Sequence, residues 1–157
     1  MGKSEVRESI GLVLVFLGLV FVGMEMRQNT RMMQAQIRQS ITDTNLEYLG
    51  WLATAEHLSE ALATVTGGGS LSDQQSRAMN GFLIAQLRAW ENEHYQNKIG
   101  LFTQEEFGAR RSTWQDRLQN APHREEYWRR WFGIRDQFAP DFRAEIDAII
   151  AGAQQAQ

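Results

Sequence analysis

The segment IGLVLVFLGLVFVGM, residues Ile10 to Met24, contains no charged and no strongly polar side chain. At about 1.5 Å per residue, a helix of this length spans about 22 Å, whereas the hydrocarbon core of a bilayer is about 30 Å thick. The gap closes if the helix extends to Met26 and the charged side chains beside it reach the headgroups. The sequence therefore predicts a transmembrane helix over residues 10–26, preceded by an N-terminal flank of residues 1–9.

Two other interpretations of this segment are less favoured. A cleavable signal peptide has an apolar region of similar length, but no small-residue cleavage motif follows here. Instead the chain continues with MEMRQNTRMMQAQIRQ, residues 24–39, which is polar, helix-favouring and free of Gly and Pro. A buried core helix is disfavoured because apolar residues occupy every face of the run, and a chain this small could hardly cover them all.

The composition narrows the classes of function. The 157 residues are 43% hydrophobic and 10% aromatic, which is typical of a globular domain. Sixteen Lys and Arg against nineteen Asp and Glu give a net charge of −3. The chain therefore lacks the basic character that is typical of a nucleic-acid-binding protein. The absence of Cys excludes disulfides, thiolate zinc sites and cysteine nucleophiles. No phosphate-binding, dinucleotide-binding or nucleophile-elbow motif occurs, so no cofactor and no enzymatic activity are predicted.

The chain beyond the span is expected to stay helical. No Gly or Pro interrupts residues 24–49, so the membrane helix is predicted to continue over residues 27–66. An apolar stripe with alternating steps of four and three follows this helix and consists of Ile37, Ile41, Thr44, Tyr48, Trp51, Ala55, Leu58, Leu62 and Val65. Such a stripe packs either within the chain or between chains. The first interpretation is favoured because the helices that follow also need a packing partner.

The remaining sequence predicts three or four shorter helices. A Gly-rich linker at residues 67–71 precedes S-D-Q-Q at Ser72, and T-Q-E-E follows at Thr103; both are capping boxes that begin helices. Pro122 and Pro140 mark two further helix starts within a helical domain of residues 72–151. The tail, residues 152–157, is expected to fray.

These elements predict an all-α fold. No strand-like alternation of useful length appears in the sequence. We expect one long N-terminal helix, transmembrane and then soluble, with three to four shorter helices packed on its soluble half.

Within the predicted span, Gly11, Gly18 and Glu25 are seven residues apart and lie on one helix stripe. Because glycines let a partner helix approach closely, this stripe predicts an oligomer seam. The alternative is that glycine is simply common in membrane helices and Glu25 lies in the interface. In a ring of at least about four or five chains, Glu25, Gln28 and Asn29 would form the mouth of a pore.

Metal binding has one weak pair of candidates. Glu91 and His94 form E-x-x-H, the spacing that ferritin-like di-iron bundles use twice together with carboxylates from two other helices. Here the motif occurs once, and His57 with Glu56 or Glu60 would have to supply further ligands. The favoured role of His94 is a hydrogen bond at the edge of an apolar helix face.

A structural polar cluster is predicted next to this pair. Arg88, Glu91 and Asn92 stand at positions i, i+3 and i+4 of a helix, beside Trp90. The spacing is that of a helix ion pair with an amide next to it. A partly buried cluster of this kind would fix the register between helices.

Several motifs resemble an uncharacterised bacterial family. Its members carry an "IRQNTR"-like motif just after a single N-terminal membrane helix, and this chain has MEMRQNTR at Met24 to Arg31. Further similarities are R-x-W-E-N at Arg88 to Asn92, Y-Q-x-x-x-G at Tyr95 to Gly100, the region around Trp114, and F-x-P-x-F from residue 138. The N-terminus differs, because it carries Lys and Arg where the family is more acidic. The resemblance implies a bacterial single-span protein and no particular activity.

The expected location is the bacterial inner membrane. Lys3 and Arg7 precede the span, and Arg27, Arg31 and Arg38 follow it. This difference slightly favours a cytoplasmic C-terminal domain. The predicted function is a non-enzymatic membrane-anchored protein that self-associates or serves as an accessory or scaffold for a membrane complex. The alternatives are a homo-oligomeric channel and a metal-dependent helical enzyme.

Overall fold

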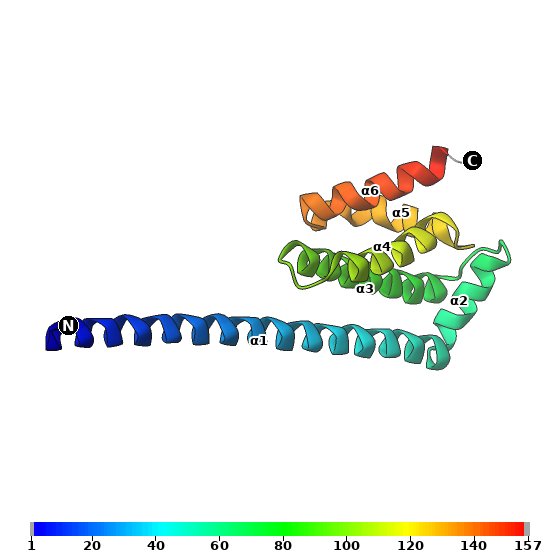
Figure 1. Cartoon of the computed structure of the whole chain (residues 1–157). Helices are drawn as coiled ribbons and strands as arrows, with labels where there is room; N and C mark the ends of the chain where they lie inside the picture. The colour runs from blue at the N-terminus through cyan, green and yellow to red at the C-terminus, as the bar shows by residue number, and fades with distance from the viewer. Residues whose placement is uncertain (1, 156–157) are drawn as a thin grey trace. The chain divides into compact units, whose positions relative to one another are not determined.

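The computed structural model describes residues 2–155, and it is 87% helical. The helices are α1 (Lys3–Thr54), α2 (Glu56–Thr66), α3 (Asp73–Lys98), α4 (Gln104–Gln119), α5 (Arg124–Ile134) and α6 (Pro140–Gln155), with a short 3₁₀ helix η1 (Arg135–Gln137) before α6 (Figure 1). The described residues contain no strand. The prediction of an all-α fold with one long N-terminal helix is therefore confirmed.

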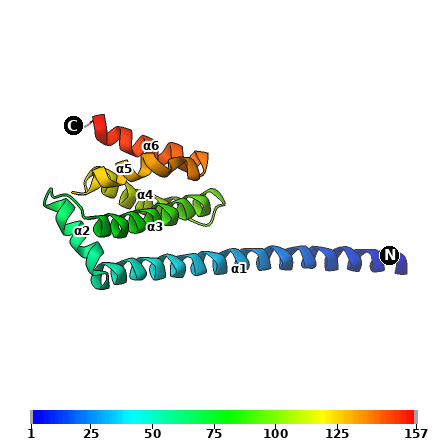
Figure 2. The ribbon, with the colours of Figure 1, turned by 180° about the vertical axis from the view of Figure 1, so that it is seen from behind.

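The chain divides into two units, residues 1–42 and 43–157, and the boundary lies within α1. The first unit is the N-terminal part of that helix. The second unit contains the last turns of α1 and all the shorter helices. Figure 2 shows α3 to α6 of the second unit from behind, where α5 and α6 lie on one side of α4 and α3 on the other.

The long helix ends earlier than the sequence predicts. It stops at Thr54, and Ala55 leaves the helical region with φ −88° and ψ 92° before α2 begins. The prediction of an unbroken helix over residues 27–66 is therefore wrong. No Gly or Pro marks the break; instead the chain turns so that Leu58 and Ala61 of α2 become buried in the core shared with α3.

The predicted helix starts and stops match the structure where they depend on local sequence. The Ser72 hydroxyl accepts a hydrogen bond from the Gln75 N–H at 3.3 Å, and the Gln75 side chain accepts one from the Ser72 N–H at 3.0 Å. Thr103 begins α4 with an equivalent capping box. Gly100, with φ 79°, ends α3, and the Leu101 N–H then donates to the Gln96 carbonyl in a Schellman motif.

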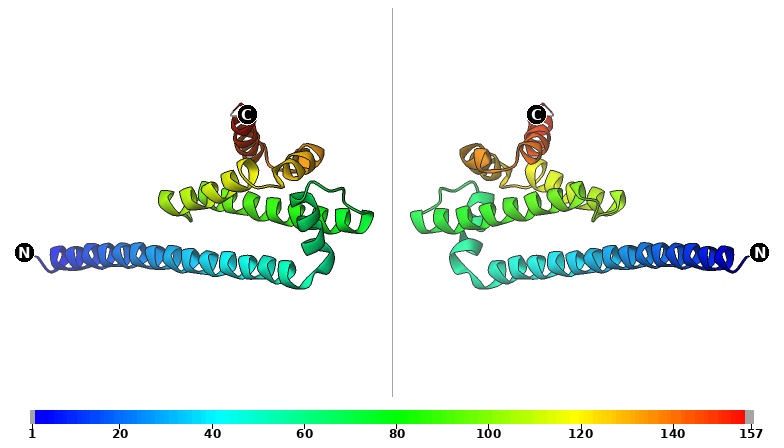
Figure 3. Two further views of the ribbon diagram at one scale, coloured as in Figure 1. Left: turned by 90° about the vertical axis from the view of Figure 1, so that its right-hand side faces the viewer. Right: turned by 90° about the vertical axis from the view of Figure 1, so that its left-hand side faces the viewer.

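The core of the second unit is aromatic. Trp90 stacks on Trp114 and on Tyr127, with ring centroids 6.0 and 5.8 Å apart. Phe142 packs edge-to-face with Trp114 and with Trp131, with ring centroids 6.0 and 5.8 Å apart. These rings come from α3, α4, α5 and α6, so they join helices that Figure 3 shows crossing at different angles. The aromatic core is therefore what holds the shorter helices together.

The apolar stripe of the long helix contributes to this core from Tyr48 onward. Tyr48 and Leu52 pack against the core, and the Tyr48 hydroxyl donates a hydrogen bond to the Ala85 carbonyl at 2.8 Å. In α2, Leu58, Leu62 and Val65 continue this packing. This part of the stripe therefore packs within the chain. Ala55 is exposed, since it occupies the break.

The C-terminal tail is more ordered than the sequence predicts. Helix α6 continues to Gln155, and Ala153 is buried. Gln119 of α4 donates to the Ile149 carbonyl at 3.1 Å, which ties the helix to its neighbour. The expectation that residues 152–157 fray is therefore wrong for residues 152–155, while 156–157 lie outside the described part of the chain.

Candidate functional site

The apolar part of α1 is exposed along its whole length. Its large side chains from Ile10 to Met26 keep between 45% and 69% of their surface accessible. Its most apolar 18-residue window has a mean hydropathy of 2.0, and none of that window is buried. By length and composition, this helix is long and apolar enough to cross a membrane. Residues of the described chain bury none of this window, and apolar surface is removed from water only by contact with other apolar groups.

The residues of the predicted oligomer seam lie on this exposed helix. Gly11, Gly18 and Glu25 are all exposed. A Cβ atom added at Gly11 or Gly18 would meet no other atom within 4 Å. Packing within one chain therefore gives no reason for a glycine at either position.

The predicted pore-mouth residues also lie on α1. Glu25, Gln28 and Asn29 line a shallow depression together with Met32. All four side chains come from consecutive turns of one helix and are exposed. One chain therefore presents these polar groups at the end of the apolar segment, but encloses no channel.

Arg88 and Glu91 of α3 contact the segment that leads into α6. The Arg88 Nη1 donates to the Glu91 Oε2 at 2.8 Å and to the Gln137 carbonyl at 3.1 Å, while its guanidinium lies 4.0 Å from the centre of the Phe138 ring. The Glu91 Oε1 accepts a hydrogen bond from the Ala139 N–H at 2.8 Å. Among the described contacts, none involves Asn92, whose side chain is exposed.

Glu91 adds a cap from another helix to the start of α6, where the Asp141 carboxylate already accepts a hydrogen bond from the Phe142 N–H at 3.0 Å. The Ala139 carbonyl accepts the first hydrogen bond of α6, from the Arg143 N–H at 2.9 Å, so Ala139 is the N-cap residue. Alanine has no side chain that can cap a helix. The carboxylate of Glu91 reaches over from α3, satisfies the Ala139 N–H and places a negative charge at the positive end of the helix dipole.

The structure gives Glu91 and His94 separate surroundings. Both carboxylate oxygens of Glu91 are engaged as described, whereas the His94 ring packs against Phe107 and Phe142 with centroids 6.3 and 5.7 Å away. Within residues 2–155, no group of three or more metal-binding side chains comes together. The geometry therefore offers these two weak candidates no further ligand.

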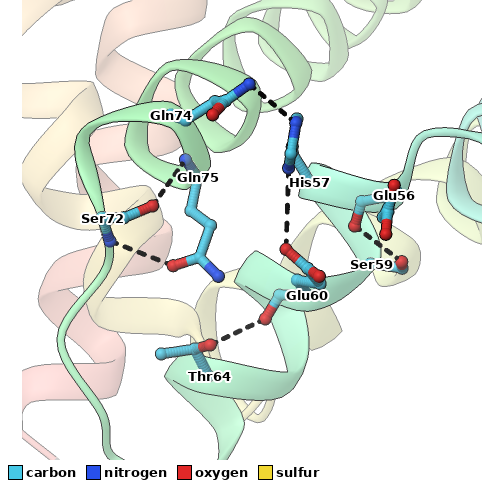
Figure 4. A network of polar contacts seen from close by, with 8 residues as sticks. All are labelled: Glu56, His57, Ser59, Glu60, Thr64, Ser72, Gln74 and Gln75. Atoms are coloured by element: carbon cyan, nitrogen blue, oxygen red, sulfur yellow. Dashed lines mark hydrogen bonds and ion pairs between the residues drawn. The ribbon is translucent and has the colours of Figure 1, made fainter.

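His57 takes part in a different polar network, at the junction of α2 and α3 (Figure 4). Its Nε2 lies 2.7 Å from the Gln74 amide nitrogen, and its Nδ1 lies 3.6 Å from a Glu60 carboxylate oxygen. Because an amide nitrogen only donates, the ring Nε2 is the acceptor in the contact with Gln74, and Nδ1 faces Glu60. The network orients α2 against the start of α3 and lies beside the Ser72 capping box (Figure 4).

A buried carboxylate in the core was not predicted from the sequence. Glu93 is 9% exposed, and its Oε2 accepts a hydrogen bond from the Trp114 indole N–H at 2.9 Å. Burial raises the pKa of Glu93, while the Trp114 hydrogen bond and the charge of Arg110 oppose that shift. Its position beside Trp90 in sequence hinted at the apolar face, but nothing local showed that Trp114 would face it.

The arginines around α5 are held by carboxylates and aromatic rings. Arg135 donates to the Asp147 carboxylate at 2.8 Å, and the same carboxylate accepts a hydrogen bond from the Trp131 indole at 2.7 Å. Arg129 pairs with Glu126 one turn away. The charges of Arg129 and Arg135 are therefore paired within the domain.

No protein-family model matches this chain, and neither a curated protein nor a solved structure matches it. The geometry above therefore carries the functional inference. Its principal feature is the exposed apolar helix, whose last turns belong to a unit that has an aromatic core of its own.

Proposed function

We propose that this chain is a non-enzymatic single-pass membrane protein whose helical domain self-associates, or acts as an accessory or scaffold, in a membrane complex. The observation that supports it most is the uncovered apolar surface of residues 10–26. Exposing so much apolar surface to water is costly, at about 25 cal/mol for each Å². A bilayer removes that cost along the whole segment.

The location proposed is the bacterial inner membrane, with the helical domain in the cytoplasm. The side of the membrane rests on the small excess of Arg after the span, namely Arg27, Arg31 and Arg38. The bacterial source rests on the resemblance of MEMRQNTR and the later motifs to the single-span family.

The non-enzymatic part of the proposal is supported by the roles of the reactive side chains. Glu91 caps α6, His94 packs between aromatic rings and His57 joins α2 to α3. Each is used in holding the fold.

A membrane fractionation experiment tests the anchor. Leu17→Arg combined with Val20→Arg places two charges at the centre of the apolar segment, where each costs about 2.5–3.5 kcal/mol on insertion scales. The double variant should move from the membrane pellet to the supernatant. Gln36→Arg, at an exposed position on the same helix outside the segment, should stay with the membranes. A wild-type chain that remains in the supernatant would overturn the proposal.

The native mass of the detergent-solubilised chain tests self-association. A pair or a larger assembly supports it, and a monomer that copurifies with a membrane protein supports the accessory role instead. The channel is the alternative that the exposed polar groups Glu25, Gln28 and Asn29 favour, because they follow the apolar segment directly. A pore needs at least about four or five chains, so a monomer or a pair would eliminate it.

A further inference from the structure

The seven-residue spacing of Gly11, Gly18 and Glu25 continues along the whole of α1. A row of residues in steps of three and four runs down one face of the helix, and we name it the α1 seam. It consists of Gly11, Leu14, Gly18, Phe21, Glu25, Gln28, Met32, Ala35, Gln39, Thr42, Leu46, Leu49 and Ala53. This spacing averages 3.5 residues, which is the repeat of a left-handed coiled coil.

Every residue of the α1 seam is exposed. At the C-terminal end of the helix, Leu46 and Leu49 each keep 60% of their surface accessible, whereas Tyr48 and Leu52 pack into the core of the second unit. The last turns of α1 therefore use one face for the domain and present the seam on another. The α1 seam is therefore an exposed row at coiled-coil spacing, apolar at both ends and polar in its middle part, and its residues have no packing partner within the described chain.

We propose that the α1 seam binds a second copy of this chain in a parallel, in-register coiled coil that extends from the span to Ala53. This inference rests on the proposed function, because it requires an anchored chain that self-associates. Two copies inserted in the same direction have their helices parallel and the same residues at the same depth. Each seam residue of one copy then faces the same residue of the other.

The charges beside the seam fit this arrangement. In a parallel coiled coil, a residue just before a seam position that is followed by a step of three, as Gln39 is, lies near the residue five places further along the partner helix. Arg38 and Asp43 have this spacing and flank the seam. Their opposite charges would therefore attract between copies in register, whereas an offset by one heptad would bring Arg38 opposite Gln36 or Gly50.

The composition of the seam indicates where the pair is held most strongly. Gly11 and Gly18 allow close approach in the span, and Leu46, Leu49 and Ala53 form an apolar end. Between Gly18 and Leu46, Gln28, Gln39 and Thr42 are polar and contribute less, and Glu25 opposes the pairing because it faces the same charge on the second copy. The two ends should therefore dominate the association.

Single cysteines test the seam directly, because the natural chain contains none. The full-length chain in membrane vesicles is treated with a mild oxidant, and the yield of disulfide-linked dimer is measured. A disulfide needs the two Cα atoms to come within about 7 Å, which same-numbered seam residues satisfy. Leu14→Cys, Thr42→Cys and Leu49→Cys should give several-fold more dimer than the exposed off-seam controls Ser40→Cys and Glu47→Cys.

The two levels of the proposal fail in different ways. If Leu14→Cys forms dimers but Thr42→Cys and Leu49→Cys do no better than the controls, the coiled coil beyond the membrane is overturned and self-association stands. If no position forms dimers and the native mass is that of a monomer, self-association itself is overturned.

A charge variant gives a second readout without cysteine chemistry. Leu46→Lys places like charges opposite each other at an exposed position, so the domain should remain folded, as its tryptophan fluorescence would show. The dimer fraction should fall several-fold, whereas Glu47→Lys, one residue away and off the seam, should leave it unchanged. Equal dimer fractions for the two variants would overturn the seam.

Discussion

The cap that Glu91 provides for α6 makes a sharp test of how the second unit is held together. In Glu91→Ala, the Ala139 N–H loses its acceptor and Arg88 loses its carboxylate partner. The rest of α3 is unchanged, because alanine is a good helix former. The variant therefore isolates the contact between α3 and the start of α6.

The contacts set the size of the effect. A carboxylate on a helix N-cap N–H contributes about 1 kcal/mol, and its interaction with the helix dipole adds about 0.3–1 kcal/mol. The ion pair with Arg88 contributes little, about 0.3–0.5 kcal/mol, because the two side chains are 44% and 23% exposed. We expect a loss of about 2 kcal/mol, which lowers the Tm of a domain of about 100 residues by roughly 8 °C.

Tryptophan fluorescence is the appropriate assay. All five tryptophans lie between Trp51 and Trp131, within the second unit, so their signal follows that unit while the long helix stays in detergent or lipid. Asn92→Ala is the matched control: the residue is adjacent on α3, exposed, and makes none of these contacts. It should leave the Tm unchanged or raise it slightly, since alanine favours the helix.

Glu91→Gln refines the interpretation. It keeps an oxygen acceptor for the Ala139 N–H but removes the charge, so it should cost less than the alanine variant. If Glu91→Ala melts within about 1 °C of the wild type, a shift that corresponds to only a few tenths of a kcal/mol, the capping role is refuted.

Three further outcomes are expected. Burial raises the pKa of Glu93 in the folded domain above its ordinary value of 4.5. The stability that protonation of Glu93 contributes is therefore complete below pH 4.5 and is lost as the pH rises through the raised pKa. Glu93→Gln should stabilise the domain at pH 7, and urea titrations should show this gain shrinking towards pH 4.5. Phe142→Ala should cost about 3–5 kcal/mol in the same titration, whereas the half-exposed Phe132→Ala should cost under about 1 kcal/mol; similar losses would contradict the aromatic core. Glu25→Gln should increase the dimer fraction in vesicles, because it removes like charges that face each other across the α1 seam, and a decrease would contradict that placement.

The tertiary cap and the buried carboxylate explain why part of the site was not predictable. Glu91 and Ala139 are 48 residues apart in the chain, and Glu93 and Trp114 are 21 apart. Helical spacing placed Arg88 and Glu91 on one face, which the structure shows in contact, but it also included Asn92, which stands outside the cluster. Spacing says which residues share a face and not what lies opposite that face.

The sequence by itself determined the features that depend on neighbours a few residues away. The apolar run defines the exposed helix, the capping boxes at Ser72 and Thr103 begin two helices, and Gly100 ends one, because each acts through backbone groups within one or two turns. Only the tertiary structure decided the break at Ala55 and the ordered end of α6. In both places the local sequence permits more than one conformation, and the burial of Leu58 and Ala153 against other helices selects between them.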